Sequence, residues 1–338
     1  MKQCDLIVAG GGFSGAAAAI AAARRGMNVL LIEKGNRFRG AAVNCLVNPC
    51  MYYWTQDPVS GETVFLANGI FREILTELTA MNAMPQNSSI FHEEYLKLIL
   101  QRMVLKENIH ILFHTWLTGV RMDNGKVRSV LVSNKEGTGE YAARYFIDCT
   151  GDGDLAVLAG YPYYLGRKKD RLCQPMTLCF RVAGVDMKAF EKSCETINPL
   201  YQQFRQEGKI KNPRENVLVF RHIVDGVLHF NSTRIIRKNP VSGEEKNQAE
   251  LEAREQVFEL FHFLKENIDG FQNSQLLSTA MEIGVRESQM IEGEYVLTQE
   301  DLMACTKFEG GVVCCNYDID IHNTEGSGTS HYFFKDGE

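Results

Sequence analysis

A glycine-rich turn near the N-terminus constrains this chain more than any other segment. Residues 5–9 form an apolar run typical of a buried strand, and an alanine-rich helix is predicted over 16–25. The turn between them places Gly10, Gly12 and Gly15 in the spacing G-x-G-x-x-G. The pattern is informative because a strand precedes it and a helix follows it, as a dinucleotide-binding βαβ unit requires.

The three glycines have different physical tasks in such a unit. Gly10 allows a sharp turn, Gly12 lets backbone amides approach a pyrophosphate, and Gly15 lets the helix pack close to the strand. The phosphates would then lie at the positive end of the helix. A second strand over 28–32 ends on Glu33, which is placed to accept hydrogen bonds from a ribose. The sequence therefore predicts a dinucleotide site; the alternative is a glycine-rich turn in an ordinary α/β domain.

Composition and charge argue against several classes of protein. The 338 residues are 45% hydrophobic, which is enough for one large domain or two closely packed ones. The net charge of −6 argues against a general nucleic-acid binder. No apolar run reaches membrane-spanning length, and no basic leader precedes the first strand. We therefore expect a mature, cytoplasmic protein without a membrane span.

The ten cysteines do not follow a metal-binding pattern. No C-x-x-C pair occurs, and Cys314 and Cys315 are adjacent rather than spaced as zinc ligands. Cys149 and Cys179 lie in apolar, strand-like segments, where a reduced thiol packs as a small hydrophobic side chain. We expect no metal site.

The rest of the first half continues the α/β pattern. A D-N-G turn at 123–125 joins two alternating segments, which predicts a β-meander inserted after a third parallel strand. A strand over 145–149 leads into a second glycine-rich turn at 150–154 and a short helix, whereas 36–60 is predicted to be a loop. The other predicted elements are helices over 68–82 and 91–107, a strand over 109–114, and meander strands over 116–122, 127–133 and 140–143.

The pattern changes after about residue 160. Alternating segments near 174–183, 216–223 and 226–232 predict an antiparallel sheet, with a D-G hairpin turn at 225–226. Helical periodicity is strong over 247–267, and the polar stretch 238–247 is predicted to be a surface loop.

Several motifs occur in a fixed order along the chain. The strand–turn–helix pattern covers 5–34, and a second motif reads I-D-C-T-G-D-G-D-L-A at 147–156. Others are N-S-T-R at 231–234, the helix at 249–264, G-V-R-E-S-Q at 284–289, G-E-Y-V-L-T at 293–298 and D-I-H at 320–322. Together they resemble FAD-dependent oxidoreductases of the glutathione-reductase-like Rossmann class, and the resemblance covers nearly the whole chain.

The resemblance implies an α/β fold in two parts. A Rossmann-like FAD/NAD(P)-binding domain would occupy 1–160, with the β-meander at 115–145. An α+β substrate domain would occupy 161–338 and partly return toward the FAD domain. Members of this class return to the FAD domain through a last strand, a glycine-containing turn and a helix, and we find no such segment after residue 300. We therefore expect a chain that is shortened relative to its family or completed by a partner chain.

The resemblance also implies FAD as the cofactor. The 36–50 loop, the meander and the second glycine-rich turn replace the regular βα units of an NAD-only dehydrogenase. Arg39 could instead be a solvated loop residue, and Asp152 could be a helix N-cap. The residues expected to bind FAD are Gly10, Gly12, Phe13, Ser14, Gly15, Glu33, Lys34, Arg39, Gly40, Ala41, Trp116, Leu117, Thr150, Gly151 and Asp152.

Substrate candidates lie where the second part would cover the flavin. Arg286 could clamp a carboxylate through two parallel hydrogen bonds, or it could form a salt bridge with Glu287. His322 could move a proton during hydride transfer, or it could be a structural histidine beside Asp320. Cys45 could be redox active or a buried, inert thiol. The substrate-binding candidates are Asn44, Cys45, Arg286 and Glu287, and the catalytic candidates are Arg286, His322 and Tyr295.

The sequence thus predicts an FAD-dependent oxidoreductase that transfers hydride or electrons between flavin and an unidentified small organic substrate. One alternative is a catalytically incompetent fragment. Another is a subunit whose FAD site needs a partner chain, with a homo-oligomer also left open. The third is an NAD-dependent dehydrogenase.

Overall fold

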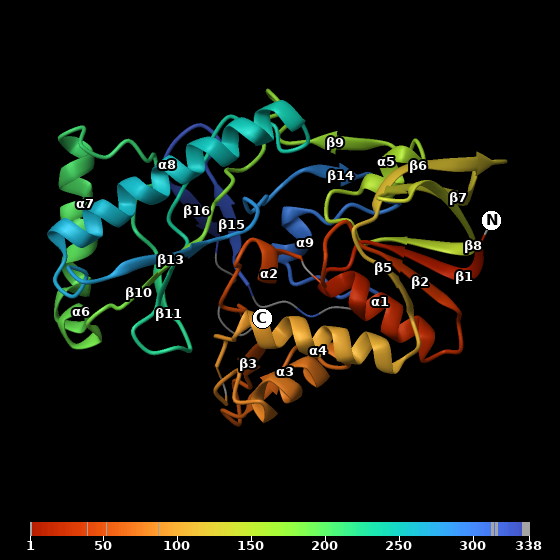
Figure 1. Ribbon diagram of the computed structural model, residues 1–338, viewed down its shortest axis with the longest axis horizontal. Helices are drawn as coiled ribbons and strands as arrows, with labels where there is room; N and C mark the ends of the chain where they lie inside the picture. Colours follow the sequence, from red (N-terminus) through yellow and green to blue (C-terminus); the bar gives the residue numbers. More distant parts are fainter. Residues whose placement is uncertain are drawn as a thin grey trace.

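A six-stranded sheet organises the first half of the computed structural model, which describes residues 2–38, 40–51, 53–86, 88–311, 314 and 317–332. The strand order is β5-β2-β1-β8-β7-β6; the first four strands run parallel and the last two are paired antiparallel (Figure 1). The strands are β1 (Lys2–Ala9), β2 (Val29–Ile32), β5 (His110–Leu112), β6 (Trp116–Asp123), β7 (Lys126–Asn134) and β8 (Gly137–Asp148). The sheet confirms the predicted α/β class.

Helices pack on both faces of the sheet. Leu6 and Val8 of β1 lie in one apolar cluster with α1, α3 and α4. Ile7 lies in a second cluster, together with Val130 of β7 and residues of α5. Because neighbouring residues of β1 are buried in different clusters, this strand is the continuous apolar run that a covered parallel sheet needs. The helices are α1 (Phe13–Ala23), α3 (Ile70–Ala80), α4 (Glu93–Lys106) and α5 (Asp154–Leu158).

Strand β8 corrects the prediction of a separate, inserted meander. The two strands predicted over 140–143 and 145–149 are one continuous strand. Residues 137–142 of β8 pair with β7, and residues 141–148 pair with β1. The chain between 143 and 145 contains no glycine, proline or asparagine that would turn it. The meander therefore extends the parallel sheet itself.

The predicted loop over 36–60 is only partly irregular. It contains the short helix α2 (Ala41–Asn44) and strand β3 (Trp54–Gln56), which pairs with β4 (Thr63–Phe65). Helix α2 follows Gly40, whose φ of +71° lies in the left-handed region that favours glycine.

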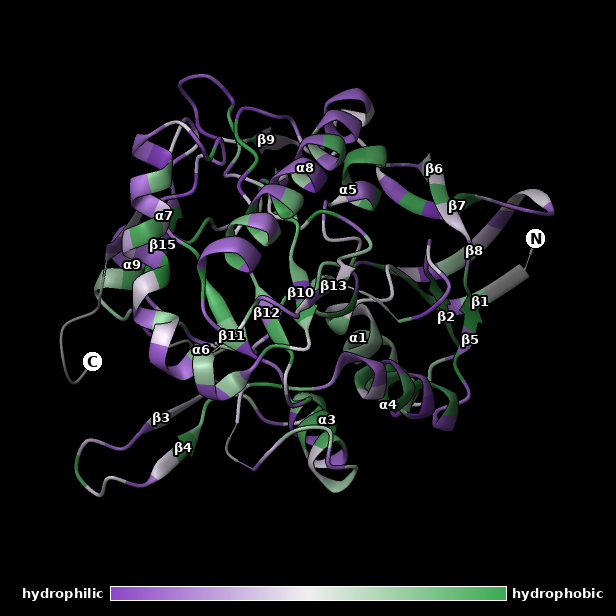
Figure 2. Ribbon diagram, turned by 60° about the vertical axis from the view of Figure 1, so that its left-hand side comes forward, coloured by the Kyte–Doolittle hydropathy of each residue, from purple (hydrophilic) through white to green (hydrophobic). Residues whose placement is uncertain are grey.

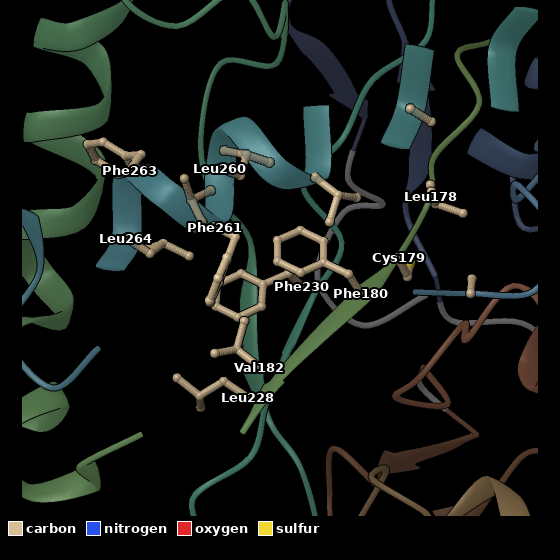
Figure 3. Close-up of a cluster of buried hydrophobic side chains, with 14 of the residues drawn as sticks. Leu178, Cys179, Phe180, Val182, Leu228, Phe230, Leu260, Phe261, Phe263 and Leu264 are labelled. Carbon is tan, nitrogen blue, oxygen red and sulfur yellow. The ribbon is translucent and has the colours of Figure 1, made fainter. Parts of the chain in front are cut away.

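A four-stranded antiparallel sheet forms the centre of the second half. Phe180 of β10 stacks on Phe230 of β12, with ring centroids 4.8 Å apart, on the face that α8 covers (Figure 3). Leu260 and Leu264 of α8 belong to the same buried cluster. Both the antiparallel sheet and its D-G hairpin are confirmed. The strand order is β11 (Val219–Arg221), β12 (Leu228–Phe230), β10 (Phe180–Ala183) and β13 (Gln275–Thr279).

Helix α8 (Gly243–Asn267) begins within the segment that was predicted to be a polar loop. Ser242 caps the helix, because its side chain accepts a hydrogen bond of 3.3 Å from the amide of Glu245. The spacing S-x-x-E is a capping signal that the sequence already contained. Figure 2 shows purple and green residues in turn along α8, as expected of a helix that is buried on one face.

The remaining elements complete the second half. Strand β9 pairs with β14, and β15 pairs with β16. None of the helices in the described part of the chain combines the length and the apolar character that crossing a bilayer demands. These elements are β9 (Tyr163–Leu165), α6 (Met187–Ser193), a 3-10 turn (Cys194–Thr196), α7 (Ile197–Gln206), β14 (Gln289–Ile291), α9 (Gln299–Met303), β15 (Ile319–His322) and β16 (Thr329–Tyr332).

A buried ion pair joins the two halves of the chain. Both guanidinium nitrogens at the end of Arg181, in β10, donate to the carboxylate of Glu93, the first residue of α4. His222 Nε2 lies 3.7 Å from the same carboxylate. Burial raises the pKa of Glu93, but the contacts with His222 and Arg181 lower that pKa more strongly, so it falls well below its usual range. Glu93 is therefore ionised and paired at neutral pH.

Replacing Arg181 by Met should destabilise the fold strongly, because it leaves the Glu93 carboxylate buried without its cation. We expect a loss of about 3–5 kcal/mol in the free energy of unfolding, measured by urea denaturation. The control is Arg128→Met, which breaks an exposed pair with Asp123 and should cost less than about 1 kcal/mol. Equal losses in the two variants would contradict the assigned role.

The same pair predicts how stability depends on pH. A carboxyl group whose folded-state pKa is lowered stabilises the fold above its unfolded pKa, and this stabilisation is lost as the pH falls toward the folded pKa. The free energy of unfolding should therefore fall below about pH 4.5, the ordinary pKa of a glutamate. The decline should be smaller in an Arg181→Met variant, measured in the same urea series at several pH values.

Candidate functional site

The glycine-rich turn holds α1 against β1 at a distance that allows no side chains. Gly10 has a φ of +99°, and a Cβ there would lie 2.2 Å from the carbonyl oxygen of Cys149. A Cβ on Gly15 would lie 1.8 Å from the carbonyl oxygen of Gly10. These two glycines are therefore required by the backbone packing of the turn itself.

Gly12 differs from the other two because it faces a second glycine. A Cβ on Gly12 would lie 3.4 Å from the Cα of Gly40, and a Cβ on Gly40 would lie 3.2 Å from the Cα of Gly12. Gly12 is also the N-cap of α1 and gives the helix no side-chain cap. The start of the helix thus keeps backbone amides that neither glycine covers with a side chain, as binding of a phosphate requires.

Glu33 organises the turn from the end of β2. Its buried carboxylate accepts hydrogen bonds from the amides of Gly11 (2.7 Å, to Oε2) and Gly35 (2.6 Å, to Oε1). A carboxylate oxygen can accept more than one hydrogen bond, so these two bonds do not prevent Glu33 from also binding a ribose. That role stays a prediction. The structure adds a role that the sequence did not reveal, which is to fix the backbone of the glycine-rich turn.

A pocket lies at the carboxyl ends of β1 and β2, where ligands bind in α/β sheets. Trp116 is exposed there, and Lys34 Nζ lies 5.4 Å from the centroid of its indole ring. Six predicted cofactor residues line the pocket: Gly10, Glu33, Lys34, Trp116, Leu117 and Thr150. Four lining residues were not predicted: Ala9, Ile32, Thr115 and Asp154.

The second glycine-rich turn is held by Asp148, which the sequence analysis did not single out. Its carboxylate accepts hydrogen bonds from the amide and hydroxyl of Thr150, at 3.0 and 2.7 Å, and from the amide of Ala156 at 3.0 Å. Thr150 in turn accepts a hydrogen bond from the amide of Asp154 at the start of α5. The N-cap of α5 is Gly153, which has no side chain, so the N-cap alternative for Asp152 is wrong.

The charged groups of this turn shift the pKa of Asp154. Burial raises the pKa of Asp154, and the negative charges of Asp152 and Asp148 raise it further, against the opposing effect of Lys34. Gly151 has a φ of +89° and open space around it. A negatively charged ligand at this turn would therefore be held by backbone amides rather than by side-chain cations.

Three of the other predicted cofactor residues can be placed in the structure. Phe13 packs edge-on against Phe71 of α3, with centroids 6.3 Å apart, so its ring supports the helices. Ser14 and Ala41 are exposed. Arg39 lies outside the described residues.

The residues of this region fit FAD. Gly12 and Gly40 lie in close contact at the helix start and place no side chain over its backbone amides, as binding of a pyrophosphate there requires. The adjoining pocket contains Glu33 for a ribose and Trp116 for an adenine ring. No group of three or more His, Cys, Asp or Glu side chains in the described part of the chain is arranged to hold a metal ion.

Helix α2 connects the glycine-rich turn to the second half of the chain. It starts beside Gly12, and at its end the carbonyl of Asn44 accepts hydrogen bonds from the amides of Met281 (2.9 Å) and Glu282 (3.3 Å). The thiol of Cys45 donates to the carbonyl of Ile283 at 3.7 Å. Two predicted substrate residues therefore lie directly against the segment that leads to Arg286.

Gln174 connects two other candidates. The amide of Gln174 donates to Glu287 Oε2 at 2.8 Å, and its side-chain oxygen accepts from the amide of His322 at 3.1 Å. Within the described residues no ion pair joins Arg286 to Glu287, so the salt-bridge alternative is wrong. Glu287 has a backbone-holding role, while Arg286 is exposed.

His322 lies beside Asp320, as expected of a structural histidine, but one of its ring nitrogens makes no hydrogen bond. Its Nε2 lies 3.3 Å from Asp320 Oδ2 but makes no hydrogen bond, although the atom is buried. Its Nδ1 lies 3.5 Å from a guanidinium nitrogen of Arg234 and 3.1 Å from the hydroxyl of Thr329. Because Arg234 can only donate, Nδ1 accepts and Nε2 carries the proton of the neutral ring.

Tyr295 is not brought to this region by any contact among the described residues. The residue is 60% exposed, and its hydroxyl donates to Asp301 Oδ2 at 2.6 Å. Its ring packs edge-on against Phe308. Its predicted catalytic role therefore has no support from a neighbouring candidate residue.

Two functional candidates were missed by the sequence analysis, although one lies in a motif that it quoted. Arg214 and Arg234 are both buried, and their charges act on His322 together with that of Arg286. Arg234 ends the N-S-T-R motif. A buried arginine cannot be recognised from sequence when the groups that hold it come from distant segments.

The fold and the pocket define an α/β protein that binds a dinucleotide. The sequence matches the family of FAD dependent oxidoreductases over residues 5–337, and the chain belongs to this family. FAD is therefore its cofactor, as predicted, and the assignment to the glutathione-reductase-like class stays a prediction. No curated protein matches the chain.

Several solved structures are similar to this chain at low identity. A geranylgeranyl bacteriochlorophyll reductase-like protein from Thermoplasma acidophilum is 15% identical over 84% of this chain and 66% of its own, with a TM-score of 0.48. The p-nitrophenol 4-monooxygenase of Pseudomonas putida is 12% identical over 86% and 70%, with a TM-score of 0.47. A myxobacterial chondrochloren halogenase is 15% identical over 85% and 64%, with a TM-score of 0.47. The chain thus spans 64–70% of the length of these three structures.

Replacing Glu33 by Gln should loosen the glycine-rich turn, because an amide NH₂ would face the N–H of Gly11 or Gly35. We expect a loss of about 1–3 kcal/mol in the free energy of unfolding without FAD, together with weaker FAD binding. The measurements are urea denaturation and fluorescence titration with FAD. The control, Glu62→Gln in an exposed loop, should change stability by less than about 0.5 kcal/mol. Unchanged stability in Glu33→Gln would contradict the assigned role.

Proposed function

We propose that this chain is a flavoenzyme that transfers a hydride between FAD and a small organic molecule. The observation that carries the proposal is the close approach of Gly12 and Gly40 at the start of α1, where a Cβ on either glycine would meet only backbone, beside the pocket that Glu33 and Trp116 line. Bound FAD supplies the redox chemistry, because its ring system accepts or donates a hydride. The protein binds and orients the two reactants and limits the access of water.

The proposal divides the work between the two parts of the chain. Residues 1–160 hold the cofactor, with the pyrophosphate at the start of α1 and the adenosine near Trp116 and Lys34. Residues 161–338 supply most of the substrate contacts. The contact between α2 and the segment 281–283 supports this division, since it joins the cofactor turn to the substrate candidates.

His322 is better arranged to donate a hydrogen bond than to accept a proton. Burial lowers its pKa to about 4, and the charge of Arg286 lowers it in the same direction, so the ring is neutral at pH 7. Its Nδ1 already accepts from Arg234, which leaves the protonated Nε2 for a substrate oxygen. A proton transfer through His322 stays a prediction that its pH profile can test.

The proposal is tested by replacing Gly12 with Val and measuring the visible flavin spectrum after incubation with FAD and desalting. The valine side chain would collide with the backbone of Gly40 and cover the start of α1, so we expect retained FAD to fall by at least about tenfold. The matched control is Gly243→Ala at the start of α8, where a Cβ meets nothing within 4 Å.

Circular dichroism must show that both variants are folded. FAD retention by Gly12→Val equal to that of the unchanged chain would contradict the placement of the pyrophosphate. An unchanged chain that stays colourless when FAD is added would favour a requirement for a partner chain. If the chain retains FAD, anaerobic bleaching of the flavin by candidate substrates then tests the hydride transfer.

A further inference from the structure

We propose that Arg286, Arg214 and His322 form a binding site for a carboxylate group of the substrate. The inference rests on the proposed function and deepens it, because it names the chemical class of the molecule that exchanges a hydride with the flavin. It predicts that the substrate is an organic acid and that the neutral analogue of the same shape binds weakly.

Three neighbouring extended segments bring Arg234, Arg286 and His322 to one place. Residues 174–178 lie between two neighbours, since Met176 bridges Ile235 on one side and Thr177 bridges Gly284 on the other. Arg234 immediately precedes Ile235, and Arg286 follows Gly284 by two residues. The side chain of Gln174, in the central segment, holds the backbone of His322. Residues that are distant in sequence therefore meet at this segment.

Arg234 has a structural role within this group. Its guanidinium donates to the carbonyls of Gly326 (2.9 Å), Asn323 (3.0 Å) and Gly328 (2.8 Å), and it reaches His322 Nδ1. These contacts use most of its donors and fix the loop that follows β15. Arg234 therefore orients His322. The positive charge of Arg234 also lies beside the site.

Arg214 and Arg286 keep donors that the described residues do not use. Arg214 is buried, yet among the described residues its guanidinium makes one hydrogen bond, a long one of 3.4 Å from Nε to Asn216 Oδ1. The guanidinium of Arg286 has no hydrogen bond or ion pair within the described part of the chain. Burial, together with the charges of Arg286 and Arg234, lowers the pKa of Arg214 to about 10.

The charges around the site do not balance. The opposite charges that act on the guanidinium groups of three arginines come from two carboxylates, Glu215 and Asp320. The three arginines are Arg214, Arg234 and Arg286. Glu215 is already engaged, since it lies 3.6 Å from Arg234 and accepts from the amide of Gly328. Among these described groups one positive charge is left over, and a bound anion would compensate it.

The donors that remain fit a carboxylate. A guanidinium presents N–H groups in a planar fork that matches two carboxylate oxygens. The buried Nε2 of His322 makes no hydrogen bond within the described residues, although Asp320 Oδ2 lies 3.3 Å away, and Arg234 orients it from the opposite side of the ring. An unsatisfied donor buried in this way costs free energy unless a ligand or a water molecule pairs with it.

The site lies on the side of the second half that faces the cofactor turn. The charge of Arg286 acts on the thiol of Cys179, and so does Cys45, whose own thiol contacts the carbonyl of Ile283. Burial raises the pKa of Cys179 to about 12, so it is a neutral, unreactive neighbour. An acid held by Arg286 would therefore lie close to the end of α2, which starts beside Gly12.

The test is isothermal titration calorimetry of the full-length chain with acetate and benzoate, each compared with its amide, at constant ionic strength. We expect at least one acid to bind about tenfold more tightly than its amide. Arg286→Gln should remove this preference, and Arg286→Lys should restore part of it, because it keeps the charge but not the fork. The control is Arg128→Gln, which changes an exposed arginine of β7 and should bind as the unchanged chain does.

Each titration is repeated with and without FAD, so that failure of this inference is distinguishable from failure of the proposed function. Acids that bind no better than amides, or equal binding by Arg286→Gln, would overturn the carboxylate site even if FAD is retained. A preference for acids that depends on Arg286 in a chain without FAD would support the site while the flavoenzyme proposal fails. Thermal denaturation of both Arg286 variants shows whether they are folded.

Discussion

The close crossing of helix α1 over strand β1 is the constraint on which the rest of the cofactor region depends. Gly15 has no room for a Cβ against the carbonyl of Gly10, and Gly10 has none against Cys149, so the helix start is fixed to the carboxyl ends of β1 and β8. Glu33 fixes the turn from β2 through the amide of Gly11. The amides that a pyrophosphate needs are therefore held in place before any ligand binds, which lowers the entropic cost of binding.

The two halves of the chain are joined by polar contacts whose energetics differ from those of the apolar cores. Glu93 and Arg181 are both buried, so either one alone would be a costly unpaired charge, and the pair holds α4 against the second sheet. Asn44 joins the halves through its carbonyl, which is a weaker and more adjustable contact. This combination holds the substrate candidates at a defined position relative to the cofactor turn while leaving Arg286 exposed.

Local patterns in the sequence predicted most elements correctly, and the errors have identifiable causes. The strand that was split at residues 140–149 is continuous because its two ends pair with different neighbours, and those partners cannot be read from the strand itself. The start of α8 was placed too late, although Ser242 and Glu245 carried the capping signal. In the site, Glu33 and Trp116, which were both predicted to bind the cofactor, line one pocket. Arg214 and Arg234 were missed, because only the fold shows which distant groups surround a buried arginine.

The sequence by itself determined the βαβ unit, the α/β class and the dinucleotide turn, since these depend on residues within about thirty positions of one another and on local backbone sterics. Tertiary structure alone decided the rest. It assigned the hydrogen bonds that hold the second glycine-rich turn to Thr150 and Asp148, and it separated Arg286 from Glu287. It also gathered three arginines around one histidine from segments spread over residues 214–322 of the chain. Charge and hydrogen-bond balance are properties of a three-dimensional neighbourhood, and a linear pattern does not contain them.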